Sequence, residues 1–167
     1  MPPAGRDGRL IGDAFLKKLS RTPVRSRRLK ILKACARIDE PWVEDVLWAS
    51  LSDPGEDIRD YLIGVLGGRR DRNPDLLRRR LAVPPWYARC AALQILGLRG
   101  SRDALPWVAE FLDDSNIEIR RYVAGALGHL GGREALKLLV RMMKDESPHV
   151  RAAAGEALGK ASPIRFS

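Results

Sequence analysis

The chain has 167 residues, 45% of them hydrophobic and 31% charged, which excludes intrinsic disorder and leaves enough apolar side chains for a core. Its formal net charge is +9, and no apolar run approaches the ~20 residues that a membrane-spanning helix needs. We therefore expect a globular protein that neither crosses nor contacts a membrane.

The first two predicted helices, over residues 9–19 and 23–38, carry the positive charge of the chain. Residues 1–38 hold eleven Lys or Arg and two acids, whereas residues 39–167 hold nineteen of each and are neutral. A local patch of this kind predicts an anionic partner at this end of the chain. The first twenty residues lack the apolar core and cleavage site of a signal peptide, so we expect a cytoplasmic protein.

The remaining helices follow at short intervals and share one pattern. Ile119, Val123, Leu127 and Leu130, for example, recur at the spacing of one helical face. The glycines that follow such runs are interpreted as helix ends, where a positive φ favours glycine. In chain order, the further helices are predicted over residues 41–51, 55–67, 74–82, 85–98, 102–112, 116–130, 133–144 and 147–161.

A repeat of about 31 residues organises these helices into pairs. Five arginines mark it, with spacings of 31, 30, 31 and 31 residues, at Arg28, Arg59, Arg89, Arg120 and Arg151. Aspartates precede three of them by six residues, at Asp53, Asp114 and Asp145. We interpret the arginines as structural groups that bond turn aspartates or carbonyls and hold adjacent repeats in register. A row of anion-binding arginines is the alternative.

The segment from Asp145 to Gly159 resembles a HEAT repeat, specifically the short type named after phycobilin lyases, and the segment from Asp114 to Gly128 is similar. The resemblance covers residues ~22–161. It implies an all-α fold, a right-handed α-α superhelix of the armadillo-type solenoid class with about five helix pairs. Stacked pairs of this kind share a continuous core that one pair alone does not have.

The resemblance predicts a single HEAT-like domain over residues 1–167, with residues 1–8 and 162–167 as flexible ends. It is less specific for function, because such repeats serve scaffolds, lyase subunits, hydroxylases and DNA glycosylases. The hydroxylases among HEAT-repeat proteins use His-Glu pairs on several repeats. This sequence has two histidines and no His-Glu dipeptide, so it predicts that this activity is absent.

No set of side chains with catalytic or metal-binding spacing emerges from the sequence. His129 and His149 each lack a second His, Cys or acid at ligand spacing, and no Ser/His/Asp or Cys/His set can be assembled. Cys35 and Cys90 show no redox spacing, and Cys35 takes a repeat position that leucine holds elsewhere, so we expect it in the core. The sequence thus predicts no catalytic residue, no cofactor and no metal.

The second helix of each pair is expected to line the concave face of the solenoid. Positions two, five and nine after each repeat arginine then point inward, and Tyr61 and Tyr122 take the same position two repeats apart. Each tyrosine has a glycine three residues later, which clears space beside the ring. Tyrosines that only fill a tight face are the alternative. The candidate partner-binding residues are Lys30, Lys33, Arg37, Tyr61, Gln94, Arg121, Tyr122 and His129.

These patterns favour a non-enzymatic scaffold or adaptor that binds a protein or peptide on its concave face. Nucleic-acid binding through residues 1–38 is the alternative, by distant resemblance to the HEAT-like DNA glycosylases, since basic side chains neutralise phosphates. A bilin-lyase subunit is a third possibility, because it shares the repeat type. We expect the protein not to be an enzyme.

Overall fold

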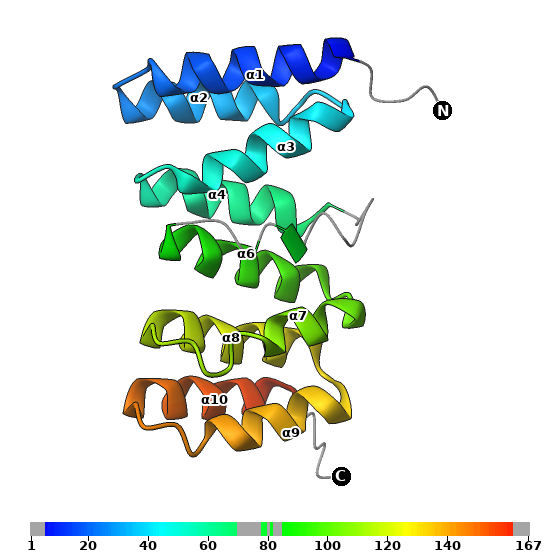
Figure 1. Ribbon diagram of the computed structural model, residues 1–167, viewed down its shortest axis with the longest axis vertical. Helices are drawn as coiled ribbons and strands as arrows, with labels where there is room; N and C mark the ends of the chain where they lie inside the picture. Colours follow the sequence, from blue (N-terminus) through cyan, green and yellow to red (C-terminus); the bar gives the residue numbers. More distant parts are fainter. Residues whose placement is uncertain (1–5, 70–77, 80, 82–84, 162–167) are drawn as a thin grey trace. The chain divides into compact units, whose positions relative to one another are not determined.

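The computed structural model describes residues 6–69, 78–79, 81 and 85–161, and these residues form helices joined by turns, with no strand among them (Figure 1). The predicted all-α class of paired helices is therefore confirmed. The helices are α1 (Arg6–Ser20), α2 (Arg25–Cys35), α3 (Pro41–Ala49), α4 (Glu56–Gly67), α6 (Trp86–Arg99), α7 (Leu105–Ala109), α8 (Ile117–Leu130), α9 (Gly132–Met142) and α10 (Pro148–Ala161). In the described part of the chain, no helix is long and apolar enough to cross a membrane.

Most predicted helices lie close to their observed bounds, with differences at the ends. The helix predicted over 102–112 is instead a short 3-10 turn, Arg102–Ala104, followed by the five residues of α7. Beyond Ala109 the chain continues in tight turns whose N–H groups bond three residues back. α1 already begins at Arg6, inside the segment predicted to be flexible.

Three predicted features fall wholly or partly outside the described residues. The helix predicted over 74–82 is described only at residues 78–79 and 81. The flexible ends predicted over 1–8 and 162–167 are described only from residue 6 to residue 8. The chain divides into two compact units, Met1–Leu66 and Gly67–Ser167, and each is described by itself.

In the first unit, α1 packs against α3. The Trp42 ring of α3 lies beside Phe15 of α1, with the ring centroids 5.2 Å apart. Leu32 and Cys35 of α2 are buried, and so is Leu62 of α4. The expectation that Cys35 belongs to the core is confirmed. Burial of these large apolar side chains is the main source of stability in this unit.

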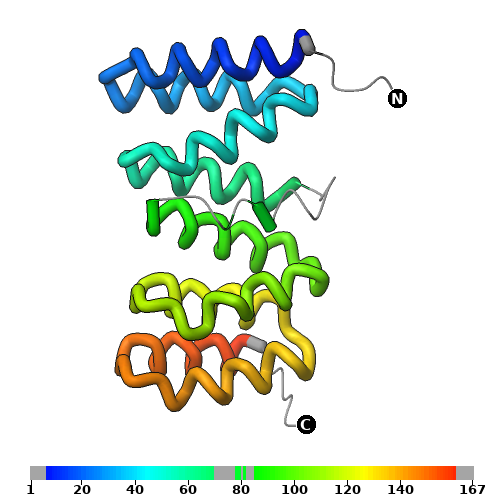
Figure 2. The backbone as a smooth tube through the Cα atoms, viewed as in Figure 1, coloured from blue at the N-terminus to red at the C-terminus, as the bar shows by residue number. Residues whose placement is uncertain are grey.

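In the second unit, α8 packs against both α6 and α10, so that three successive second helices lie side by side (Figure 2). Two glycines allow this close packing. A Cβ atom added to Gly97 would lie 2.9 Å from Cα of Ala126, and one added to Gly128 would lie 2.9 Å from Cβ of Ala157. Both distances are too short for any larger side chain to fit without a shift of the helices.

The interpretation of these repeat glycines as helix ends was wrong, because Gly97 and Gly128 lie inside α6 and α8. The helix ends are at Gly100 and Gly131, which take positive φ angles of 66° and 61°. Glycine adopts such angles at little cost because it lacks a Cβ atom. The repeat period therefore marks helix contacts, and the helix ends follow three residues later.

The repeat arginines hold successive helix pairs together within each unit. Arg28 donates two hydrogen bonds to the carboxylate of Asp53, at 2.6 and 3.0 Å. Arg120 does the same with Asp145, at 2.9 and 3.1 Å, and also donates to the backbone carbonyl of Asp114 at 2.7 Å. Each aspartate accepts a further bond from a backbone N–H two residues later, as Asp145 does from Ser147. The structural interpretation of the arginines matches these contacts.

The electrostatics of the Arg120–Asp145 pair agree with this role. The side chains are only 6% and 10% exposed. Burial acts to raise the pKa of Asp145, but the hydrogen bonds from Arg120 and from the Ser147 N–H outweigh it, so the pKa lies below its usual value. The hydrogen bond to Asp145, opposed by burial, raises the pKa of Arg120. The pair is therefore fully charged and serves as a clasp between repeats.

Candidate functional site

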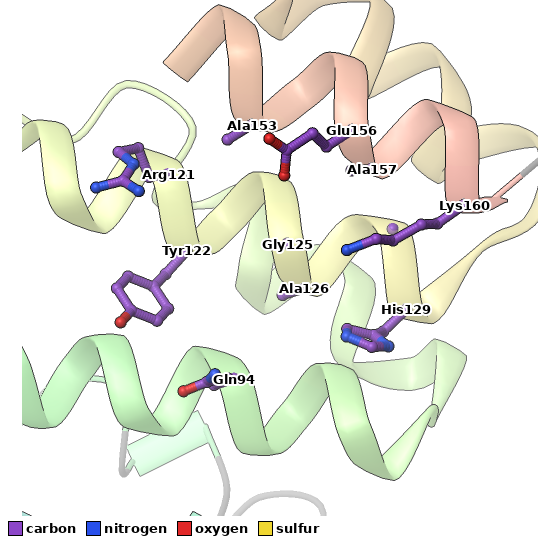
Figure 3. Close-up of a pocket in the computed structure, with 11 residues that line it drawn as sticks. Gln94, Arg121, Tyr122, Gly125, Ala126, His129, Ala153, Glu156, Ala157 and Lys160 are labelled. Atoms are coloured by element: carbon purple, nitrogen blue, oxygen red, sulfur yellow. The ribbon is translucent and has the colours of Figure 1, made fainter. Parts of the chain in front are cut away.

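A pocket of about 460 Å³ lies over the three second helices of the second unit. Figure 3 shows Glu156 and Lys160 reaching from α10 toward α8, while Tyr122 and His129 reach from α8 toward α6, where Gln94 lies. The complete lining consists of Gln94, Arg121, Tyr122, Gly125, Ala126, Gly128, His129, Ala153, Glu156, Ala157 and Lys160. Small side chains form the floor, and polar or charged side chains form the rim.

The repeat explains why a hollow forms here. The inward positions of α8 and α10 carry Gly125 and Ala153, and an added Cβ atom at Gly125 would meet nothing within 4 Å. The close approach at Gly128 brings the two helices together below this open space. Larger polar side chains at the other inward positions surround the open space that Gly125 and Ala153 leave. A concave site with a few convergent polar groups is the usual form of a small-ligand site.

The charged groups of the pocket differ in whether they are already paired. Arg121 donates hydrogen bonds to both oxygens of Glu118, at 3.0 and 2.9 Å, so its charge is largely balanced. Glu156 and Lys160 take part in no ion pair within the described residues. The pocket is consequently dipolar, with an acid and a base that are both available to a ligand.

The polar groups of the pocket have complementary chemistry. A carboxylate such as Glu156 accepts hydrogen bonds, an ammonium such as Lys160 donates them, and the amide of Gln94 does both. The imidazole of His129 can donate and accept hydrogen bonds through its two ring nitrogens. The set can therefore orient a polar ligand through hydrogen bonds and charge.

Four of the predicted binding residues come together in this pocket, namely Gln94, Arg121, Tyr122 and His129. Their partner-binding role stays a prediction, while their shared location is observed. Glu156 and Lys160 were missing from the predicted set, although positions five and nine of the last repeat carry them. The same periodic rule that selected Gln94 and His129 was the signal that would have found them.

The other four predicted residues belong to the first unit. The Lys33 ammonium lies over the Tyr61 ring, 5.5 Å from its centroid, which is a cation–π contact. Lys30 lines a different pocket together with Lys18 of α1. Arg37 follows the end of α2 and is exposed. The partner-binding role of these four residues stays a prediction.

The Cys90 thiol offers no nucleophile. Both cysteines are buried and neither forms a disulfide in the part of the chain that the structure describes, and burial, the largest influence, raises the pKa of the Cys90 thiol to about 12. Such a thiol stays protonated at neutral pH, and only the thiolate is strongly nucleophilic. Across the residues that the structure describes, no group of three or more His, Cys, Asp or Glu side chains could hold a metal ion.

Paired helices clasped by a repeating arginine define a helical-repeat protein. Residues 73–159 match the family model described as HEAT repeats, and the chain belongs to this family. The predicted HEAT resemblance is therefore confirmed, whereas the narrower likeness to phycobilin-lyase-type repeats stays a prediction.

Curated relatives of the chain include two deoxyhypusine hydroxylases. The enzyme of Rattus norvegicus is 36% identical over 80 residues, which is 47% of this chain and 26% of the relative. The enzyme of Mus musculus is 36% identical over 77 residues, which is 45% of this chain and 26% of the relative. The matched stretch is thus about a quarter of the length of these relatives.

Among solved structures, human deoxyhypusine hydroxylase in complex with glycerol superimposes with a TM-score of 0.51 and 17% identity. The match covers 96% of this chain and 77% of that one. This likeness shows a shared fold.

These comparisons correct the functional prediction. A non-enzymatic scaffold, with nucleic-acid binding as its alternative, was expected because no catalytic motif is visible in the sequence. The curated relatives are enzymes, so kinship favours an enzyme over a non-enzymatic scaffold. The expectation of no enzymatic activity was therefore wrong. The prediction relied on short motifs, whereas residues that share one face of a repeat protein lie about 31 residues apart in the sequence.

Proposed function

We propose that this protein is an enzyme and that the pocket over α6, α8 and α10 is its substrate-binding site. The observation that carries the proposal is the convergence of Gln94, His129, Glu156 and Lys160 on one hollow in a chain whose curated relatives are enzymes. In a structural pair such as Arg120–Asp145 the two charges neutralise each other, whereas Glu156 and Lys160 form no ion pair with any residue that the structure describes. Charges left available in a concave site favour ligand binding over a purely structural role.

The substrate class follows from the charge pattern and from the relatives. The relatives are named for deoxyhypusine, so a peptide that contains this amino acid is the first substrate to consider. An amine group of the substrate would bind the carboxylate of Glu156, and the Tyr122 ring would provide an apolar and π-rich wall. Lys160 and Gln94 would donate hydrogen bonds to carbonyl groups of the peptide.

In this proposal the pocket residues bind the substrate and transfer protons. His129 and Glu156 are the groups that would accept or return a proton at the bound substrate. The His-Glu pairs that family resemblance associates with the hydroxylases have no counterpart in the sequence, and the described residues do not form a ligand set for a metal. We assign no step in this pocket to a metal.

A binding and turnover experiment tests the proposal. A fluorescently labelled peptide that contains deoxyhypusine is titrated with the protein, and mass spectrometry then follows its covalent change over time. Glu156→Gln should weaken binding by about 10–100-fold, because it removes a charge-assisted hydrogen bond worth about 1.5–3 kcal/mol. His129→Asn should slow the covalent change with a smaller effect on binding.

A matched pair of glycine variants controls for folding. Gly125→Leu places a large side chain inside the pocket, whereas Gly64→Leu makes the same change at the same repeat position in α4, again with open space around it. We expect only Gly125→Leu to abolish binding. Wild-type protein that neither binds nor changes the peptide would refute the proposed substrate, and equal effects of the two glycine variants would refute the pocket.

Location in the cytoplasm is part of the same proposal. It rests on Cys35 and Cys90, which are both buried thiols that form no disulfide with each other, as expected in a reducing compartment.

A further inference from the structure

A second pocket, of about 430 Å³, lies at the turn between α1 and α2 in the first unit. Four of its lining residues are charged, and all four are cations: Lys18, Arg21, Arg27 and Lys30. Two come from the end of α1 and the residue after it, and two come from α2. The helix turn therefore gathers positive charge that lies up to twelve residues apart in the sequence.

Three other cations of α2 are engaged by neighbouring groups. Arg25 lies 3.3 Å from the carboxylate of Asp57, and Arg28 donates hydrogen bonds to Asp53. Lys33 lies over a tyrosine ring. By contrast, none of the four pocket cations forms an ion pair in the part of the chain that the structure describes. Three cations of α2 thus have partners, whereas the four cations of the pocket stay unbalanced among the described residues.

The surroundings add to the positive potential. α2 has no acidic residue in its first turn, and its N-cap, Val24, provides no side-chain hydrogen bond. The N-terminus of a helix carries a partial positive charge from its unpaired N–H groups. Four like charges around one hollow repel each other, so an anion that binds there relieves repulsion as well as gaining direct contacts.

We propose that this pocket binds the phosphate groups of a small ligand that carries two or three linked phosphates. Guanidinium groups such as Arg21 and Arg27 bind phosphate oxygens in a bidentate manner, and Lys18 and Lys30 add point charges from the two helices. Four cations balance the charge of a pyrophosphate or triphosphate, which exceeds that of a single phosphate. The hollow shape favours a compact anion over an extended polymer, which needs a long groove.

The experiment uses inorganic pyrophosphate and triphosphate as probes and measures binding by titration calorimetry at two salt concentrations. The double variant Arg21→Gln/Arg27→Gln should weaken binding of both probes at least tenfold. The control is Arg9→Gln/Lys17→Gln, which removes the same charge from exposed positions of α1 outside the pocket. The control should change affinity less than threefold, and the helical circular dichroism of both variants should match the wild type.

Three outcomes would overturn the proposal. The first is no detectable binding of either probe at low salt. The second is an equal loss of affinity in both double variants, which would indicate diffuse attraction to a basic surface. The third is a 20-nucleotide single strand that binds more tightly than triphosphate and loses affinity equally in both variants, which would indicate a polymer-binding face. None of these outcomes depends on the peptide assay of the second-unit pocket, so the two proposals fail or succeed separately.

Discussion

At the residue scale, Arg120 is a charged side chain that is almost fully buried, and its neighbour Arg121 is not. Arg120→Ala would leave the carboxylate of Asp145 buried without its partner, which costs about 3–5 kcal/mol of unfolding free energy. Arg121→Ala removes an exposed pair with Glu118 and should cost less than about 1 kcal/mol. Urea denaturation of both variants measures the difference. If Arg120→Ala left the stability unchanged but abolished ligand binding, the repeat arginines would be ligand-binding groups and not structural ones.

The arginine–aspartate pairs also show which side-chain contacts can be predicted from the sequence alone. The repeat period predicts the helix pairs and the bonding of the arginines to turn aspartates or carbonyls. It does not show which aspartate each arginine bonds, and in the structure the carboxylate partner of Arg28 and of Arg120 lies 25 residues later. The contact between Lys33 and Tyr61 could not be predicted in the same way, since it depends on the distance between two helices. Glu156 and Lys160 occupy the same repeat positions as predicted site residues. The repeat position alone, however, does not show which inward side chains surround a pocket.

At the scale of one element, α8 contains two glycines with opposite roles. A methyl group at Gly125 meets nothing within 4 Å, so Gly125→Ala should stabilise the helix by about 0.5–1 kcal/mol through higher helix propensity. A methyl group at Gly128 meets Cβ of Ala157 at 2.9 Å and its Cα at 3.2 Å. Gly128→Ala should therefore destabilise the protein by about 1–3 kcal/mol, because the helices must move apart. Thermal unfolding of the two variants should shift in opposite directions, and shifts of the same sign would contradict the assigned helix contact.

The helix ends were predicted at the wrong glycines because glycine serves both helix ends and close helix contacts. A small residue eight positions after each arginine fits a helix end and a close helix contact equally well in a linear pattern. Only the packing of α8 against α10 distinguishes them, because it places Gly128 opposite Ala157. The helices end at Gly100 and Gly131, which adopt a positive φ. In the sequence, the only sign of this backbone conformation is the glycine itself.

At the scale of the whole molecule, stability in a repeat protein is a sum of local terms between neighbouring repeats. Leu127 of α8 is fully buried, and Leu127→Ala should cost about 2–5 kcal/mol through lost burial and a residual cavity. Because the cavity lies in the second unit, amide hydrogen exchange should accelerate in α6, α8 and α10 much more than in α1 and α3. Leu47→Ala, at a fully buried leucine of α3, is the matched change in the first unit and should reverse this distribution. Uniform acceleration in both variants would show that the chain unfolds as one cooperative unit, and that result would contradict the local account of its stability.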